Sequence, residues 1–227
     1  MIDTAAQTGS SQPGCLRYGL LIAFSIVVIL AVGIGYFVIW RHQASVEYYT
    51  VEEFSPVKSA SVSSDSVLGI EAKLDELVKA YEDNSPATVV ISAEELAALP
   101  SAKQFPAELR QRLALRLEGS TVAAEFSFKL RDLSLGFAEI IQGKRLDRYA
   151  TGQLRAQLTM VNDTPRITLA ELSLAHKNLE DMALKGAQEW FQGALESLIA
   201  SDPRLAGRIL RAETSAEGVL IQLRSLP

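Results

Sequence analysis

Apolar and polar residues alternate along two long stretches of the chain, and this alternation predicts two β-hairpins. In the first stretch, apolar residues occupy every second position from Leu113 to Leu117, a turn follows at residues 118–120, and the alternation resumes from Val122 to Leu130. In the second stretch, GQLRAQLTMVNDTPRITLAELSL (152–174), apolar residues again occupy every second position on both sides of a turn at Asn162 to Pro165. A period of two residues places the apolar side chains on one face of a sheet and leaves the other face polar.

The alternation of the second hairpin changes phase at Ala170-Glu171. Leu169 belongs to one phase, whereas Leu172 and Leu174 belong to the opposite one. Such a change predicts a β-bulge or a bend in the strand. A sheet that bends at this position can curl around a neighbouring element.

Helical spacing appears in three other places. Residues 68–81 place Leu68, Leu74, Leu77, Val78 and Tyr81 on one side of a helix. Thr88 to Ile91 reads as a short strand that leads into a helix at Ser92, where Ser92 and Glu95 have the spacing of a capping box. The strongest helix is Asp181 to Ala200, whose apolar side contains Leu184, Ala187, Phe191, Ala194, Leu195 and Leu198.

The remaining segments are less regular. Residues 135–150 fit either a strand with a loop or a short helix. Asp202-Pro203 ends the long helix and can start a further short helix through RLAGRIL (204–210). Alternating Val219, Ile221 and Leu223 predict a terminal strand after a turn at residues 216–218.

One uncharged segment near the amino terminus predicts a membrane span. Residues 18–40 carry no charge between Arg17 and Arg41, and as a helix they would be about 34 Å long, which is enough to cross a hydrocarbon core of about 30 Å. The alternative is a cleaved signal peptide, but the apolar run exceeds the usual length and RHQAS (41–45) is a poor cleavage site. We therefore expect an uncleaved anchor. The flanking charges nearly balance, and the long domain after a short tail favours export of that domain.

These patterns divide the chain into four parts and predict its fold class. The parts are a short tail (1–17), the transmembrane helix (18–40), a flexible Ser-rich tether (41–65) and an exported domain (66–227). The expected fold is α+β: the transmembrane helix is followed by a curled antiparallel sheet packed on the long C-terminal amphipathic helix.

Composition and motifs argue against catalysis, metal binding and nucleic-acid binding. The net charge is -5, and no run of Lys and Arg residues forms a basic face. Cys15 is the only cysteine, and His42 and His176 lie far apart with no metal-ligand spacing. No nucleophile motif, P-loop or dinucleotide fingerprint occurs, and neighbouring carboxylates such as Glu94-Glu95 point apart on a helix. The sequence therefore predicts a protein that is not an enzyme, has no cofactor and does not bind nucleic acid.

The apolar face of the predicted sheet is the candidate ligand site. It needs a cover, and the helix 181–200 can supply one, so its residues either form the core or line a groove for an apolar ligand. Trp190 and Phe191 point about 100° apart on that helix, so that one ring can face such a groove. The candidate ligand-binding residues are Phe126, Phe128, Leu154, Leu158, Met160, Ile167, Leu169, Trp190 and Phe191.

Several of these segments resemble small bacterial envelope proteins of the YpmS-like and YceB-like kind. The similarity lies in ISAEELAAL (91–99), the hairpins including RYATGQLRAQLTM (148–160), and LEDMALKGAQEWFQGAL (179–195) followed by the VLIQL strand (219–223). The YceB-like proteins are compared with half of a tubular lipid-binding (TULIP) domain. The resemblance implies an amino-terminal anchor, strands that curl round a late helix, and lipid binding.

Together these observations predict a single-pass protein of the bacterial inner membrane, held there by Tyr18 to Trp40, with its C-terminal domain facing the periplasm or the cell exterior. We expect the domain to bind an apolar ligand such as a lipid. The alternative is a structural or assembly subunit that binds an envelope protein partner and no small molecule, for which the small-residue pairs in the span and the tether are the supporting features.

Overall fold

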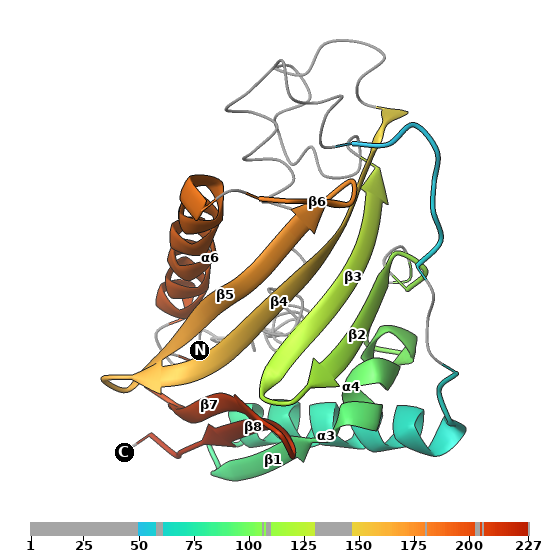
Figure 1. Ribbon diagram of the computed structural model, residues 1–227. Coiled ribbons are helices and arrows are strands. Elements are labelled where there is room, and N and C mark those ends of the chain that lie inside the picture. Colours follow the sequence, from blue (N-terminus) through green and yellow to red (C-terminus); the bar gives the residue numbers. More distant parts are fainter. Residues whose placement is uncertain are drawn as a thin grey trace, which may run out of the picture.

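The computed structural model has two antiparallel sheets and three α-helices in the part of the chain that it describes, which is residues 50–57, 61–105, 107, 110–129, 147–179, 181–202, 205 and 207–226. Figure 1 shows that the small sheet lies across one end of the large sheet, with α6 beside β5. The elements in chain order are α3 (Ser64–Glu82), β1 (Ala87–Ile91), α4 (Ala93–Ala98), the 3-10 helix η2 (Leu99–Ser101), β2 (Leu113–Glu118), β3 (Thr121–Lys129), β4 (Tyr149–Val161), β5 (Thr164–Leu174), β6 (Lys177–Asn178), α6 (Asp181–Ser201), β7 (Ile209–Ser215) and β8 (Gly218–Leu223).

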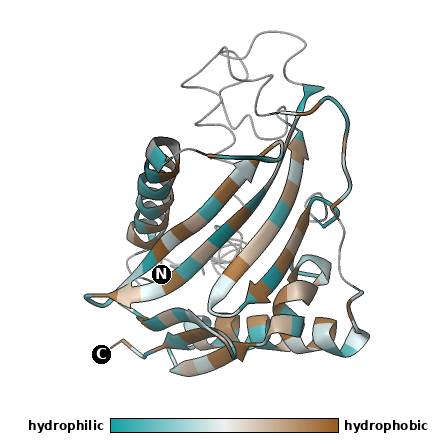
Figure 2. Ribbon diagram, viewed as in Figure 1, coloured by the Kyte–Doolittle hydropathy of each residue, from teal (hydrophilic) through white to brown (hydrophobic). Residues whose placement is uncertain are grey.

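The large sheet is an antiparallel meander with the strand order β2-β3-β4-β5-β6, and it confirms both predicted hairpins. Residues Gly119 and Ser120 form the first turn, where Gly119 has a φ of 61°. Asn162 and Asp163 form the second turn with φ values of 52° and 58°, the left-handed pair that a two-residue hairpin turn needs. Apolar and polar residues alternate along these strands in Figure 2, so that one face is apolar and the other is polar.

The predicted phase change in β5 is a β-bulge. The register shifts between Arg155 and Ala156: Arg155 lies opposite Glu171, whereas Ala156 lies opposite Leu169, so that Ala170 is the extra residue. Leu172 then faces Leu154 on the same side of the sheet as Leu169. The bulge therefore keeps the apolar residues of β5 on one face despite their change of parity.

The small sheet has the order β1-β8-β7 and includes a strand that the sequence analysis missed. The terminal strand is confirmed as β8, but it pairs on one side with β1, where Val89 lies opposite Ile221, and on the other with β7. Within the expected short helix 204–210, Leu205 is helical, whereas Ile209 and Leu210 belong to β7. β7 was missed because its residues ILRAETS carry little apolar alternation.

The expected single curled sheet is therefore wrong, although the chain is α+β. Two separate sheets are present, and neither is closed or curled. One reason is that β8 pairs with the distant β1 instead of extending the meander. A second reason is that the meander ends soon after β5: on the side away from β4, β5 pairs only with the two-residue β6, and α6 lies against β5. The helix itself is confirmed, and it buries Ala187, Phe191 and Leu195.

Two glutamines of α6 bind the unpaired backbone of β5. Gln188 accepts a hydrogen bond from the Leu169 amide and donates one to the Ile167 carbonyl. Gln192 accepts from the Ile167 amide at 3.1 Å and donates to the Pro165 carbonyl at 3.4 Å. Side-chain amides one helical turn apart thus take the place of a neighbouring strand, which satisfies polar groups that would otherwise be left open at a sheet edge.

The buried guanidinium of Arg208 joins the end of α3 to the segments that precede β1 and follow β8, which lie at one end of the small sheet. Arg208 is 1% exposed, and its nitrogens donate to the carbonyls of Tyr81 (2.6 Å), Ala80 (2.9 Å), Ser85 (2.7 Å) and Arg224 (3.0 Å). Ala80 and Tyr81 lie in the last turn of α3, where carbonyls lack helical partners and the helix dipole favours a cation. The guanidinium also lies 5.4 Å from the centre of the Tyr81 ring.

The predicted helix 68–81 is confirmed as α3, with one error in its buried side. Leu74, Leu77 and Tyr81 are buried, but Leu68 is 64% exposed, and Ile70 is fully buried instead. The apolar side of the helix is rotated relative to the predicted one because the helix packs on β1 and α4.

The capping box at the start of α4 is confirmed, and it is linked to α3 by an ion pair. Ser92 and Glu95 exchange the two expected hydrogen bonds. Lys73 of α3 donates to Glu95 and also to the Val90 carbonyl at 2.6 Å. Burial acts to raise the pKa of Glu95, but the hydrogen bonds from Lys73 and Ser92 and the charge of Lys73 outweigh it and hold the pKa below its ordinary value.

The predicted membrane span, residues 18–40, lies outside the described residues. Among the residues that are described, no helix is both long and apolar enough to cross a bilayer. Of the predicted tether (41–65), residues 50–57 and 61–65 are described. The first run contacts the start of β4: Val51 pairs with Tyr149, and Arg148 bonds to Thr50 and Glu52. We call residues 50–57 the strap. α3 begins at Ser64.

Replacing Arg208 by Met should lower the free energy of unfolding by about 3 kcal/mol, because four carbonyls, two buried and two partly buried, would each lose a charged hydrogen-bond donor. Arg208→Lys should lose less, since it keeps the charge but not the planar fork. Urea denaturation monitored by circular dichroism measures both. Arg211→Met removes an exposed arginine three residues further along, in β7, and is the control, with an expected change within about 0.5 kcal/mol. Equal effects at the two positions would contradict the assigned role of Arg208.

Glu95 should make part of the stability of the domain dependent on pH. The pKa of Glu95 is lower in the folded protein than in the unfolded chain. The ionised carboxylate therefore contributes its full share of the folding stability above the ordinary glutamate pKa of about 4.3. This share is lost as the pH falls through the lowered pKa of the folded protein. Glu95→Gln should therefore narrow the difference between urea midpoints measured at pH 7 and pH 3.5. Glu94→Gln, on the exposed side of the same turn, should behave like the wild type. An unchanged pH dependence in Glu95→Gln would refute this role.

Candidate functional site

An apolar cavity of about 110 Å³ lies where the two sheets meet. The large sheet contributes Leu115, Val122, Ala156, Leu158 and Ile167 from its apolar face, and the hairpin residues Gln157 and Pro165 also border the cavity. The opposite wall comes from the small sheet, and Leu96 of α4, Leu195 of α6 and Leu205 also line the cavity. The residues of the small-sheet wall are Ile209, Ala212, Thr214, Val219, Ile221 and Leu223.

The cavity offers almost no free polar group to a ligand. Gln157 and Thr214 are its only polar residues among those that the structure describes. The Thr214 hydroxyl already accepts a hydrogen bond from the Leu158 amide at 3.1 Å and is 3.4 Å from the Leu158 carbonyl oxygen, to which it donates. This contact joins β7 to the part of β4 that runs past the β2-β3 turn. A cavity of this kind excludes water and favours an apolar occupant.

Its size limits what such an occupant can be. Pockets that hold drug-sized ligands usually measure about 300–1,000 Å³. The present cavity is nearer to the engineered cavity of about 150 Å³ that takes up benzene. It has room for a short alkyl group or the end of a longer chain, but not for an entire acyl chain.

The structure brings only some of the predicted ligand-binding residues to this cavity. Leu158 and Ile167 line it. The others with described side chains lie elsewhere: Met160 is partly exposed near the β4-β5 turn, and Phe126, Phe128, Leu154, Leu169 and Phe191 are buried in the core. Trp190 lies on α6, but its side chain is not among those described.

The aromatic residues of β3 have a packing role in the core. The Phe126 and Phe128 rings stack with their centres 6.0 Å apart, and Phe126 lies opposite Gly152 of β4. A Cβ at Gly152 would come within 2.9 Å of the Phe126 ring and 2.1 Å of the Ser173 carbonyl oxygen. Only glycine therefore lets the ring lie across this strand.

The sequence analysis missed the wall that the small sheet supplies. The alternation of Val219, Ile221 and Leu223 signals an apolar face, but not which surface that face meets. Ala212 and Thr214 carry no such signal, because a small and a polar side chain on a short strand do not stand out in the hydrophobic pattern. Their place in the cavity follows from pairing with β8, which puts Ala212 opposite Ile221.

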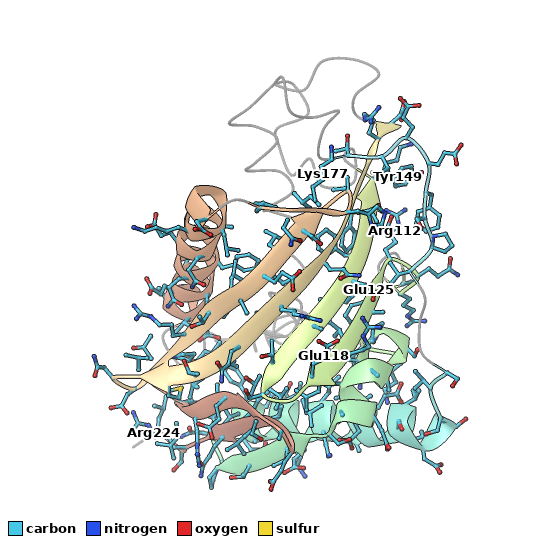
Figure 3. The ribbon with its side chains drawn as sticks, in the orientation of Figure 1. Arg112, Glu118, Glu125, Tyr149, Lys177 and Arg224 are labelled. Atoms are coloured by element: carbon cyan, nitrogen blue, oxygen red, sulfur yellow. The ribbon has the colours of Figure 1, made fainter. Side chains whose placement is uncertain are left out.

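The other face of the large sheet carries a network of charged side chains. Arg116 of β2 pairs with Glu125 of β3 at 2.5 Å, and Arg155 of β4 pairs with Glu118 at 3.0 Å and with Glu171 of β5 at 3.2 Å. Glu118 and Glu125 are labelled along the β2-β3 hairpin in Figure 3. We call this the polar face. The pairs are exposed, so each contributes little stability, but together they fix the side chains across four strands.

The described residues contain no cluster of three or more His, Cys, Asp or Glu side chains that could hold a metal ion. His176 is exposed in the turn between β5 and β6, and Cys15 and His42 lie outside the described residues. The absence of catalysis and of a cofactor stays a prediction.

Comparison of the chain with protein-family models, curated proteins and solved structures finds no match.

Proposed function

We propose that this is a membrane-anchored, non-enzymatic protein of the bacterial envelope whose domain binds an apolar ligand in the cavity between its two sheets. The observation that carries the proposal is the cavity itself, with a volume of about 110 Å³ and walls made almost entirely of aliphatic side chains. A void of this kind lowers stability unless it is filled, so its retention is better explained by a ligand than by packing alone.

The cavity size narrows the class of ligand. A chain end or a short branched alkyl group fits, and each methylene that enters gains about 0.8 kcal/mol from leaving water. The rest of the ligand would then lie outside the cavity. A lipid or fatty acid that inserts only its terminal carbons meets both conditions.

The proposed anchor places the domain near a source of such molecules. Residues 18–40 are expected to cross the membrane, and the described chain resumes at Thr50, so few residues separate the bilayer from the strap. A tethered domain samples a high effective concentration of lipid at the bilayer surface, so that even weak affinity gives occupancy.

Filling the cavity from its wall should abolish binding. Ala212→Leu places three additional carbons into the space, and Ala212→Val places two, so the affinity for decanoic acid should fall by at least about tenfold in the first variant and less in the second. Binding is measured by titrating the full chain with decanoic acid and following the NMR signals of the isoleucine methyl groups of the protein. Ile209 and Ile221 line the cavity and should shift, whereas Ile91 should not.

Ala216→Leu introduces the same side chain at an exposed turn position and is the matched control, which should bind like the wild type. Failure of decanoic acid to move the Ile209 and Ile221 signals, together with the absence of any co-purifying lipid in native mass spectrometry, would overturn the proposal and leave the cavity as a packing defect.

A further inference from the structure

Four polar side chains form a row across β3, β4, β5 and β6 on the polar face of the large sheet. Glu125 lies opposite Gln153, Gln153 opposite Ser173, and Ser173 opposite Asn178. Residues directly opposite each other in antiparallel strands share a face, so the four side chains project to the same side, and Figure 3 labels Glu125 at one end of the row. We call them the polar row. Adjacent strands are about 4.8 Å apart, which makes the row about 14 Å long.

A hollow of about 540 Å³ lies over the polar row. Its far wall is the strap, which contributes Ser55, Pro56 and Val57, and His176 and Glu171 border it as well. The strap is held in place at the start of β4. The Val51 amide donates to the Tyr149 carbonyl at 2.9 Å, and the Phe54 ring lies 5.6 Å from that of Tyr149. The hollow therefore has the strap on one side and a regular row of hydrogen-bonding groups on the other.

Three members of the row keep their hydrogen-bonding capacity for a ligand. Within the described part of the chain, the side chains of Gln153, Ser173 and Asn178 make no hydrogen bond. Ser173 is the least exposed of the three, at 8%, and it lines the hollow. Its hydroxyl is not among the buried, unpaired side-chain atoms of the described residues, so solvent reaches it and a ligand hydroxyl can take the place of that water.

The charges around the hollow select the kind of ligand. Glu125 and Glu171 line it with no lysine or arginine among the described lining residues, which disfavours an anion. Each of these carboxylates is already paired, Glu125 with Arg116 and Glu171 with Arg155, which reduces their attraction for a cation. Both still have free lone pairs. The site thus favours a neutral molecule with many groups that donate and accept hydrogen bonds.

We propose that the hollow binds a carbohydrate through its hydroxyl groups. A sugar hydroxyl donates to a carboxylate and accepts from an amide, and the row supplies carboxylate, amide, hydroxyl and amide in sequence along about 14 Å. This length matches a di- or trisaccharide rather than a single ring. The site is separate from the apolar cavity, since the two share no lining residue, and it does not depend on the function proposed above.

The test is a titration of the full chain, kept in a detergent without a sugar headgroup, with cellotriose, maltotriose and tri-N-acetylchitotriose. Saturation-transfer NMR detects binding, and the side-chain amide signals of Gln153 and Asn178 report where it occurs. At least one trisaccharide should bind, and Gln153→Ala and Ser173→Ala should each weaken it by at least about tenfold. Thr168→Ala changes an exposed residue of β5 that does not line the hollow and should leave the affinity unchanged.

Three results would overturn the proposal. The first is that none of the three trisaccharides gives saturation transfer. The second is that Gln153→Ala and Ser173→Ala bind the sugar as well as Thr168→Ala does, which would place binding elsewhere. The third is that spermidine, titrated in parallel, binds in place of the sugars and shifts the same amide signals, which would make the carboxylates a cation site. Because Ala212→Leu fills only the apolar cavity, it should leave sugar binding intact.

Discussion

The buried guanidinium of Arg208 is the contact that fixes the small sheet to α3. It lies just before β7 and holds the last turn of α3, Ser85 before β1 and Arg224 after β8 through four backbone carbonyls. A charge buried to this extent is tolerated only when several dipoles surround it, and the carboxyl end of a helix provides them. Because β1, β7 and β8 are thereby fixed to α3, the small sheet presents a defined wall to the large one. The cavity lies between that wall and the apolar face of the large sheet.

The edges of both sheets are satisfied by side chains from other elements rather than by further strands. Gln188 and Gln192 bind the backbone of β5, Thr214 binds the backbone of β4, and Lys73 binds the carbonyl of Val90 in β1. Polar side chains that bind an edge in this way remove the need for the sheet to close on itself. The sequence pattern, an apolar sheet face followed by a long helix, suggested a curled sheet. Because the edges are satisfied in this way, the same pattern belongs here to an open sheet.

The two faces of the large sheet present different surfaces. The apolar face forms most of the core and one wall of the small cavity, where ligand selection would depend on volume. The polar face carries compensated charges and the row from Glu125 to Asn178, where selection would depend on the spacing and direction of hydrogen bonds. Strand alternation produces this division directly, because each strand sends neighbouring side chains to opposite faces.

The sequence alone determined the features that depend on local periodicity and capping. These are both hairpins of the large sheet, the bulge at Ala170, the helices α3 and α6, and the capping box of Ser92 and Glu95. Each is encoded within a few residues, so that spacing and turn chemistry suffice to predict it. The apolar alternation of β8 was visible in the same way.

Only the tertiary structure decided which surfaces meet. Ala87 pairs with Leu223 from almost the opposite end of the domain, and no local pattern specifies that partner. The same holds for the exposure of Leu68, the burial of Arg208 and the use of glutamines at the β5 edge. The physical reason is that strand pairing and buried polar contacts are selected by the free energy of the whole fold, in which one alternation pattern is compatible with several partners.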